Sequence, residues 1–375
     1  MTLQTSEALA TSSNVYTWEP PDRVIAARYG LREEQILRFD LNTSPRAPDF
    51  LVDALAGPFD PPLNEYPDST YAELAEAAAD YVRAEPGEIL VGCGADEVLD
   101  IIAKAFLGPG DSSVVPIPTY SYYGVLTSQR GARLTAILRL GPNDAFALDL
   151  PAMRDALADA AVVWLCAPNN PTGAPESRAA LEALFEAAAG LPGGGPAIVA
   201  DEAYIEFQPG SLVGLRERYP SLVVVRTLSK AFALPGLRVG YAVARRDTIA
   251  RLERFRPPGS ISTVSATIAA AALRRPELAA DNAAALGDER EWLAGRLADL
   301  GCSAYPSVTN FLLCRIGSQE EAERLTEHLL RGGIVPRTFG PANPLRGHLR
   351  FTVRDRGQNE RLLEVLGAWV DGRTE

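Results

Sequence analysis

One lysine of this chain stands among residues suited to chemistry at a carbonyl group. The 375 residues include only two lysines, Lys104 and Lys230, and Lys230 has Thr227 and Ser229 before it and Arg238 after it. A neutral lysine amine can add to a carbonyl and form a Schiff base, whereas an arginine guanidinium stays protonated. Lys230 is therefore the candidate nucleophile, and we expect Lys104 to be a solvated surface residue.

Polar side chains also follow two other predicted strands. Asn170 lies in a Pro- and Gly-containing loop after residues 161–166, and Asp201 and Tyr204 follow residues 197–200. Loops beyond the carboxyl ends of parallel strands are where doubly wound folds bind ligands. Because a buried, unpaired carboxylate is costly, Asp201 is expected either to pair with a cation or to cap a turn.

A third feature is a glycine-containing turn, residues 92–94, before an apolar-periodic helix. Backbone N–H groups at such a helix start, here those of Ala95 and Asp96, can bind a phosphate with the helix dipole behind them. Asp96 could equally be a simple helix cap. The local sequence leaves both interpretations open.

Together these groups meet the requirements of pyridoxal phosphate. Its aldehyde needs a lysine, and its pyridinium nitrogen needs an anion that keeps the ring protonated and electron-withdrawing. Its phosphate needs hydroxyls, a guanidinium and a helix start. The three strand ends and the glycine turn supply all of these groups, so the sequence predicts a pyridoxal phosphate site.

The pattern of apolar segments predicts an α/β fold with a doubly wound, mostly parallel sheet. Short apolar runs alternate with alanine-rich helical stretches, which is typical of parallel sheets. The expected strands are residues 113–117, 161–166, 197–200, 222–226 and 239–244.

The last part of the chain changes character and indicates a smaller α+β domain. Its expected elements are a helix near 288–300, strands near 310–316 and 348–353, and a terminal helix from about 358. We expect three parts, with the second boundary near a Pro- and Gly-rich stretch. These are an N-terminal arm over 1–40, a large cofactor-binding domain over 41–260 and a small C-terminal domain over 261–375.

Composition limits the partners. The 36 basic and 48 acidic residues give a net charge of −12, which argues against nucleic acid. No run of about 18 apolar residues predicts a membrane span, and the first 14 residues lack the features of a secretory signal. Four scattered cysteines and two histidines argue against a metal site and favour reduced thiols in the cytoplasm.

The motifs resemble those of the fold-type I pyridoxal phosphate dependent aminotransferases, and most closely the histidinol-phosphate aminotransferase family. The resemblance runs from about Tyr16 to the last helix and is carried by TLSKAFALPGLR, APNNPTG, DEAYIEF, GCGADE and NEYPD. It implies a homodimer with shared active sites. Such an enzyme would transfer an amino group from L-histidinol phosphate, or a similar amino substrate, to 2-oxoglutarate.

The resemblance implies a role for each cofactor-binding residue. Lys230 would form the Schiff base and carry the proton, and Asp201 would pair with the pyridinium nitrogen. Tyr204 and Asn170 would bind the ring oxygen, and Tyr120 would lie over the ring. The cofactor phosphate would be held by Ala95, Asp96, Thr227, Ser229, Arg238 and, from the neighbouring subunit, Tyr66.

The resemblance also implies substrate-binding residues. Arg350 would clamp the α-carboxylate, which suits the bidentate geometry of a guanidinium, with Asn170 beside it. Arg337, thirteen residues earlier, would bind the substrate phosphate with help from Tyr16. The alternative is that Arg337 is an exposed loop charge.

The chain departs from the family pattern at residues 42–48, where relatives commonly carry Asn-Glu-Asn-Pro followed by Gly-Pro. This departure leaves the substrate open, including an aromatic amino acid (phenylalanine or tyrosine) as the amino donor. A threonine-phosphate decarboxylase is less favoured, because those enzymes typically have phenylalanine where Tyr204 stands. A non-catalytic cofactor-sensing regulator is also disfavoured, since no basic recognition helix is visible.

Overall fold

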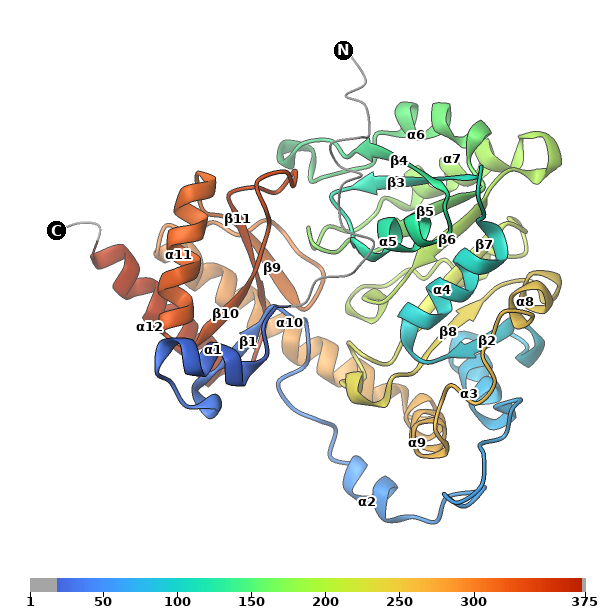
Figure 1. Ribbon diagram of the computed structural model, residues 1–375, viewed down its shortest axis with the longest axis horizontal. Coiled ribbons are helices and arrows are strands. Elements are labelled where there is room, and N and C mark those ends of the chain that lie inside the picture. Colours follow the sequence, from blue (N-terminus) through green and yellow to red (C-terminus); the bar gives the residue numbers. More distant parts are fainter. Residues whose placement is uncertain (1–18, 373–375) are drawn as a thin grey trace.

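The computed structural model describes residues 19–372, which form two sheets with helices around each (Figure 1). The larger sheet contains the cofactor motifs, and the smaller sheet is built mainly from the last third of the chain. The long helix α10 (Pro276–Asp299) runs from one sheet toward the other.

The large sheet has the strand order β2-β8-β7-β6-β5-β3-β4. β3 to β7 run parallel, whereas β8 is antiparallel to both of its neighbours. The strands are β2 (Ile89–Gly92), β3 (Ser112–Ile117), β4 (Arg133–Leu138), β5 (Val162–Cys166), β6 (Ala197–Asp201), β7 (Leu222–Thr227) and β8 (Gly240–Val243). The predicted mostly parallel, doubly wound sheet is confirmed. β4 was not predicted, because as the edge strand it is only partly buried and lacks a continuous apolar run.

Helices cover both faces of this sheet, since successive side chains of a strand point to opposite faces. In β7, Leu222 and Val224 belong to one apolar core, and Val223 and Val225 belong to the other. Burial on both faces explains why these strands are continuous apolar runs in the sequence. The covering helices are α3 (Ala72–Val82), α6 (Leu150–Ala156), α7 (Arg178–Ala189) and α9 (Thr263–Leu273) on the first face, and α4 (Gly94–Phe106), α5 (Tyr122–Gln129) and α8 (Arg246–Glu253) on the second.

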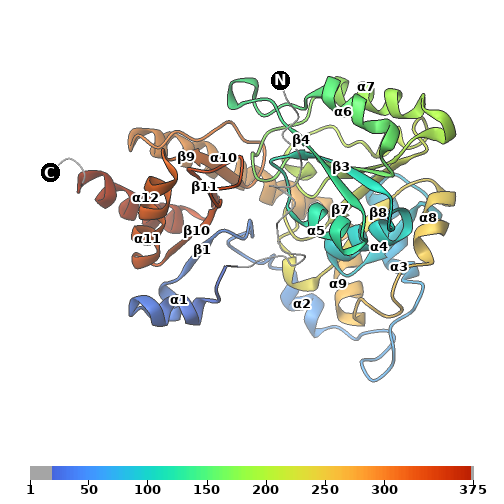
Figure 2. The ribbon, with the colours of Figure 1, turned by 45° about the horizontal axis from the view of Figure 1, so that its top comes forward.

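The small sheet has the order β1-β10-β11-β9. Its strands are β1 (Leu37–Phe39), β10 (Ile334–Thr338), β11 (His348–Thr352) and β9 (Phe311–Arg315), and its helices are α1 (Asp22–Tyr29), α10, α11 (Gln319–Arg331) and α12 (Arg356–Asp371). β1 pairs in parallel with β10, and Figure 2 shows α1 beside this sheet. The N-terminal segment therefore completes the small sheet.

Packing around α9 and α10 bears on where one domain ends and the next begins. Ala269 and Ala270 of α9 lie in a core of the large sheet, together with residues of α3. Leu286 and Leu293 of α10 lie in the core of the small sheet, as does Phe39 of β1. We propose on this packing that the boundary lies within α10 and that β1 belongs to the small domain.

Gly240, the first residue of β8, allows this strand to lie against the start of α4. A Cβ atom at position 240 would lie 2.4 Å from the backbone nitrogen of Ala95 and 2.6 Å from the carbonyl carbon of Gly94. Neither atom can move without shifting the helix. The glycine therefore sets the position of the helix start that carries the predicted phosphate site.

We expect Gly240→Ala to lower the free energy of unfolding by roughly 1–3 kcal/mol, as overpacking does, measured by urea denaturation. Gly236→Ala is the matched control, because a Cβ atom there meets nothing within 4 Å. Equal stability of the two variants would contradict the steric role of Gly240.

Candidate active site

A cavity of about 560 Å³ lies where the carboxyl ends of β5, β6 and β7 face the small sheet. The predicted site residues that line it are Ala95, Asp96, Tyr120, Asn170, Asp201, Tyr204, Thr227, Ser229, Lys230, Arg238, Arg337 and Arg350. Tyr66 does not line this cavity and is 92% exposed. Tyr16 lies outside the described residues. The fold thus brings together side chains from both ends of the chain.

Asp201, the last residue of β6, is a buried carboxylate at the base of the cavity. The hydroxyl of Tyr123 donates to its Oδ2 atom (2.8 Å), and the N–H of Ala203 donates to its Oδ1 atom (3.1 Å). Burial raises the pKa of Asp201 to about 6, and these two hydrogen bonds oppose the rise. A cationic ligand group near this carboxylate would stabilise its charged form further.

Tyr123 is a site residue that the sequence did not reveal. Its ring is fully buried and stacks on Trp164, with the centroids 5.4 Å apart and the planes 5° from parallel. This packing holds the phenol against Asp201. Tyr123 lies in the first turn of α5 and not in the loop that ends β3, and the docking of that helix on the sheet brings it to the carboxylate.

Lys230 follows β7, and its Nζ atom lies inside the cavity. Nζ donates to the carbonyl oxygen of Leu41 (3.3 Å) and lies 5.7 Å from the ring centroid of Tyr204. Loss of hydration, followed by the nearby cation of Arg350, lowers the pKa of Lys230 to about 8. About a tenth of such amines are neutral at pH 7, far more than for an ordinary lysine. The amine is therefore ready to act as a nucleophile.

Donor groups gather at the start of α4. Tyr120 donates from its hydroxyl to Asp96 Oδ1 (3.0 Å), and the Arg238 guanidinium is 3.2 Å from Asp96 Oδ2. The hydroxyl of Thr227 donates to that of Ser229 (2.9 Å). Two hydroxyls, a guanidinium and the N–H groups of a helix start form a donor set suited to a phosphate.

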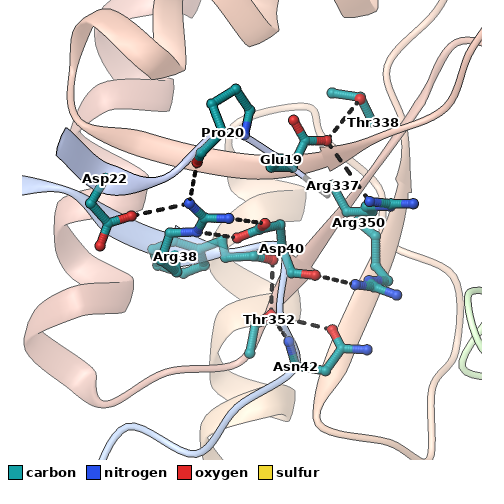
Figure 3. Close-up of polar contacts among 11 residues, drawn as sticks. Glu19, Pro20, Asp22, Arg38, Asp40, Asn42, Arg337, Thr338, Arg350 and Thr352 are labelled. Carbon is teal, nitrogen blue, oxygen red and sulfur yellow. Dashed lines mark hydrogen bonds and ion pairs between the residues drawn. The ribbon is translucent and has the colours of Figure 1, made fainter. Parts of the chain in front are cut away.

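Tyr204 is buried, and its hydroxyl accepts a hydrogen bond from the Asn42 side-chain amide (2.9 Å). Burial raises the pKa of Tyr204, so its hydroxyl stays protonated and can donate. Asn42 is held in turn by Thr352, whose hydroxyl accepts from the Asn42 backbone N–H (2.9 Å; Figure 3). The segment that departs from the family pattern therefore begins at a residue that contacts Tyr204.

Two arginines lie side by side on the small-sheet wall of the cavity. Arg337 of β10 and Arg350 of β11 are directly opposite each other in the antiparallel register, so their side chains share one face. Arg350 is buried and donates to the Asn170 side-chain oxygen and to the Asp40 carbonyl. Arg337 forms an ion pair with Glu19 (3.9 Å; Figure 3). This wall can bind two anionic groups of one ligand.

Comparison with known proteins agrees with this geometry. The family model described as aminotransferase class I and II matches residues 52–366. The chain belongs to this family. It is therefore an aminotransferase, as the sequence predicted, and membership of the family implies pyridoxal phosphate as the cofactor.

Relatives and solved structures support the same assignment. A histidinol-phosphate aminotransferase of Roseiflexus castenholzii is 36% identical over 361 residues, which cover 94% of each chain. Another from Shigella dysenteriae is 36% identical over 312 residues, covering 82% of this chain and 85% of that protein. The crystal structure of histidinol-phosphate aminotransferase from Sinorhizobium meliloti in complex with pyridoxal-5'-phosphate matches with a TM-score of 0.85 and 23% identity, over 99% of both chains. The predicted fold class and the resemblance to this family are confirmed.

We expect Tyr123→Phe to weaken the binding of pyridoxal phosphate about tenfold at neutral pH, as the loss of a hydrogen bond to a charged group does. Without this donor the pKa of Asp201 rises further, so less carboxylate would be available to a cationic group of the cofactor. The dissociation constant is measured by titrating the cofactor-free aminotransferase and following absorbance.

Tyr219→Phe is the control for this experiment, because it removes a buried tyrosine hydroxyl that bonds Glu186 instead of Asp201. We expect this variant to bind the cofactor as the wild type does. If Tyr123→Phe also retains wild-type affinity, the hydroxyl of Tyr123 does not contribute to binding of the cofactor.

Proposed function

We propose that this aminotransferase is a pyridoxal phosphate dependent histidinol-phosphate aminotransferase. L-Histidinol phosphate gives up its amino group and becomes imidazole acetol phosphate, and 2-oxoglutarate accepts the group and becomes glutamate. The observation that carries the proposal is the pair Arg337 and Arg350 on one wall of the cavity. The identity of 36% to enzymes named for this reaction supports it.

The residues of the cavity fit the cofactor. When bound, pyridoxal phosphate supplies an aldehyde that reacts with amines and a ring that withdraws electrons from the substrate α-carbon. The carboxylate of Asp201 would keep the ring nitrogen protonated by its charge, and Tyr204 and Asn170 would donate to the ring oxygen. Tyr120 would cover one face of the ring. Its phosphate would be bound by the backbone of Ala95 and Asp96 and by the side chains of Thr227, Ser229 and Arg238.

Lys230 would have two tasks in this mechanism. Its Nζ atom would first bind the cofactor aldehyde. After the substrate has displaced it, the free amine of Lys230 would take a proton from the substrate Cα. A pKa of about 8 suits both tasks, because efficient acid–base groups titrate near the working pH.

The two arginines would orient the substrates. Arg350, held by Asn170 and the Asp40 carbonyl, would bind the α-carboxylate of 2-oxoglutarate and glutamate. Arg337 would bind the phosphate of L-histidinol phosphate and the second carboxylate of 2-oxoglutarate. One cavity would thus accept two chemically different substrates in turn.

We also propose a homodimer in which Tyr66 binds the cofactor phosphate in the partner subunit. Support comes from the helix α2 (Leu51–Ala56) and the loop after it, which extend away from the sheets (Figure 1). Val52 is 76% exposed, Leu63 64% and Tyr66 92%, and such apolar exposure is typical of an interface. No helix within residues 19–372 is long and apolar enough to cross a membrane. A cytoplasmic location is part of the proposal.

We expect the cofactor-free protein to react with pyridoxal phosphate faster as the pH rises, with half the maximal rate near pH 8. The pKa of Lys230 is about 8, and only its neutral amine, which dominates above that pH, adds to an aldehyde. Stopped-flow measurement of the yellow absorbance checks this.

Lys230→Ala should develop no such absorbance, whereas Lys104→Ala should behave as the wild type, because Lys104 pairs with Asp100 on the surface. A rate that does not change between about pH 6 and 9 would contradict the lowered pKa.

The substrate is tested by Arg337→Ala. We expect kcat/KM for L-histidinol phosphate to fall about 100-fold, while that for L-phenylalanine falls less than about threefold, since only the first substrate has a phosphate. Arg346→Ala removes an exposed arginine of the same region and is the control. Equal losses of kcat/KM for both substrates would contradict the proposal that Arg337 binds the substrate phosphate. A wild-type protein that reacts with phenylalanine alone would be an aromatic amino acid aminotransferase.

A further inference from the structure

Glu19 places a carboxylate in the substrate cavity beside Arg337. We propose that Glu19 is a specificity-determining residue: it competes for Arg337 with the anionic group of a substrate that binds there, so that this anion binds together with a proton. The inference rests on the proposed function in one respect, the binding of a substrate anion by Arg337.

The position of Glu19 is the first observation. Its side chain lines the cavity and is 25% exposed. Its Oε1 atom lies 3.9 Å from the Arg337 guanidinium and accepts a hydrogen bond from the hydroxyl of Thr338 (3.5 Å). Figure 3 shows Glu19 joined by dashed lines to both Thr338 and Arg337 of β10. A ligand anion bound to Arg337 would therefore lie close to this carboxylate.

The second observation is that the chain next to Glu19 is anchored. The Arg38 guanidinium donates to the carbonyl oxygen of Pro20 (2.8 Å) and to the carboxylates of Asp22 (3.0 Å) and Asp40 (2.6 and 2.8 Å). Figure 3 shows these four residues joined through Arg38. Because β1 carries Arg38, this cluster ties the segment before α1 to the small sheet. Glu19 is thus held at the cavity wall.

The charges around Glu19 explain why a proton would accompany the anion. Burial and, to a smaller extent, the charge of Asp40 raise the pKa of Glu19. The cations of Arg337 and Arg38 and the hydroxyl of Thr338 lower it. Burial is the largest of these effects, and the net result is a raised pKa. An anion on Arg337 adds a like charge and withdraws the cation from Glu19, and both effects favour protonation. A protonated Glu19 can donate a hydrogen bond to the bound anion.

The direction of the pH dependence follows. Below the raised pKa of Glu19 its carboxyl is neutral, and a second anion binds Arg337 without competition. Above that pKa the carboxylate is ionised, and the anion must displace it. A carboxylate that is bound by Arg350 alone does not meet Glu19. Glu19 therefore makes the affinity for substrates with an anionic group on Arg337 depend on pH.

Glutarate and butyrate, used as probes of the cofactor-loaded enzyme, separate this effect from others. Their carboxyl groups are mostly ionised above about pH 6, so the probes themselves titrate little. We expect the affinity ratio of glutarate to butyrate, measured as competitive inhibition, to fall in the wild type as the pH rises above about 6, by up to about fivefold. Other pH effects on the site act on both probes and cancel in the ratio.

Glu19→Gln should remove this fall and bind glutarate more tightly than the wild type at high pH. Glu19→Ala should do the same, which would show that the negative charge of Glu19 is responsible. Exposed Glu34→Gln, in the same N-terminal segment, is the matched control and should retain the wild-type ratio. A Glu19→Gln variant that binds glutarate more weakly, or keeps the pH dependence, would overturn the proposal.

Arg337→Ala distinguishes this failure from failure of the proposed function. If this variant binds glutarate as the wild type does, Arg337 binds no second anion, and both the inference on Glu19 and the proposed role of Arg337 are wrong. If it loses glutarate but Glu19→Gln has no effect, only the inference on Glu19 is overturned. If the glutarate results hold and L-histidinol phosphate is not a substrate, only the proposed donor is wrong.

Discussion

The carboxylate of Asp201 is the group on which the rest of the site depends. A charged group buried at the end of a strand is stable only with hydrogen-bond donors or a cation. Tyr123 and the N–H of Ala203 supply the donors, and stacking on Trp164 holds the phenol. A cationic ligand group in the cavity would stabilise the charged form further. Because Tyr123 belongs to α5, the packing of this helix on the large sheet influences the charge of Asp201 and so the kind of ligand group that fits beside it.

The residues that line the cavity come from both sheets. The large sheet contributes the groups suited to the cofactor, including Lys230 and Asp201, while the small sheet contributes Arg337 and Arg350. Hydrogen bonds such as that from Arg350 to Asn170 join the two. A displacement of one sheet against the other would therefore separate Arg337 and Arg350 from Lys230 and Asp201.

Much of the fold could be predicted because the large sheet is buried on both faces, which requires continuous apolar strands. The strand ends then indicated Asn170, Asp201 and Lys230. The edge strand β4, the three-residue strand β1 and the strand β10 lack that pattern and were not predicted. The expected boundary at residues 260–261 also rested on a local Pro- and Gly-rich stretch, whereas α9 packs against α3, nearly two hundred residues earlier in the chain.

The sequence by itself determined the chemistry: a lysine in a nearly lysine-free chain, an aspartate after a buried strand, and hydroxyls and arginines in a recognisable order. Residue type and local spacing are enough for that, since the reactivity of a group depends on its kind. Only the tertiary structure decided the pKa values of Asp201 and Lys230, the contact of Tyr123 with Asp201 and the place of Glu19 beside Arg337. Burial and charge pairing arise between residues far apart in the chain, and no local pattern records them.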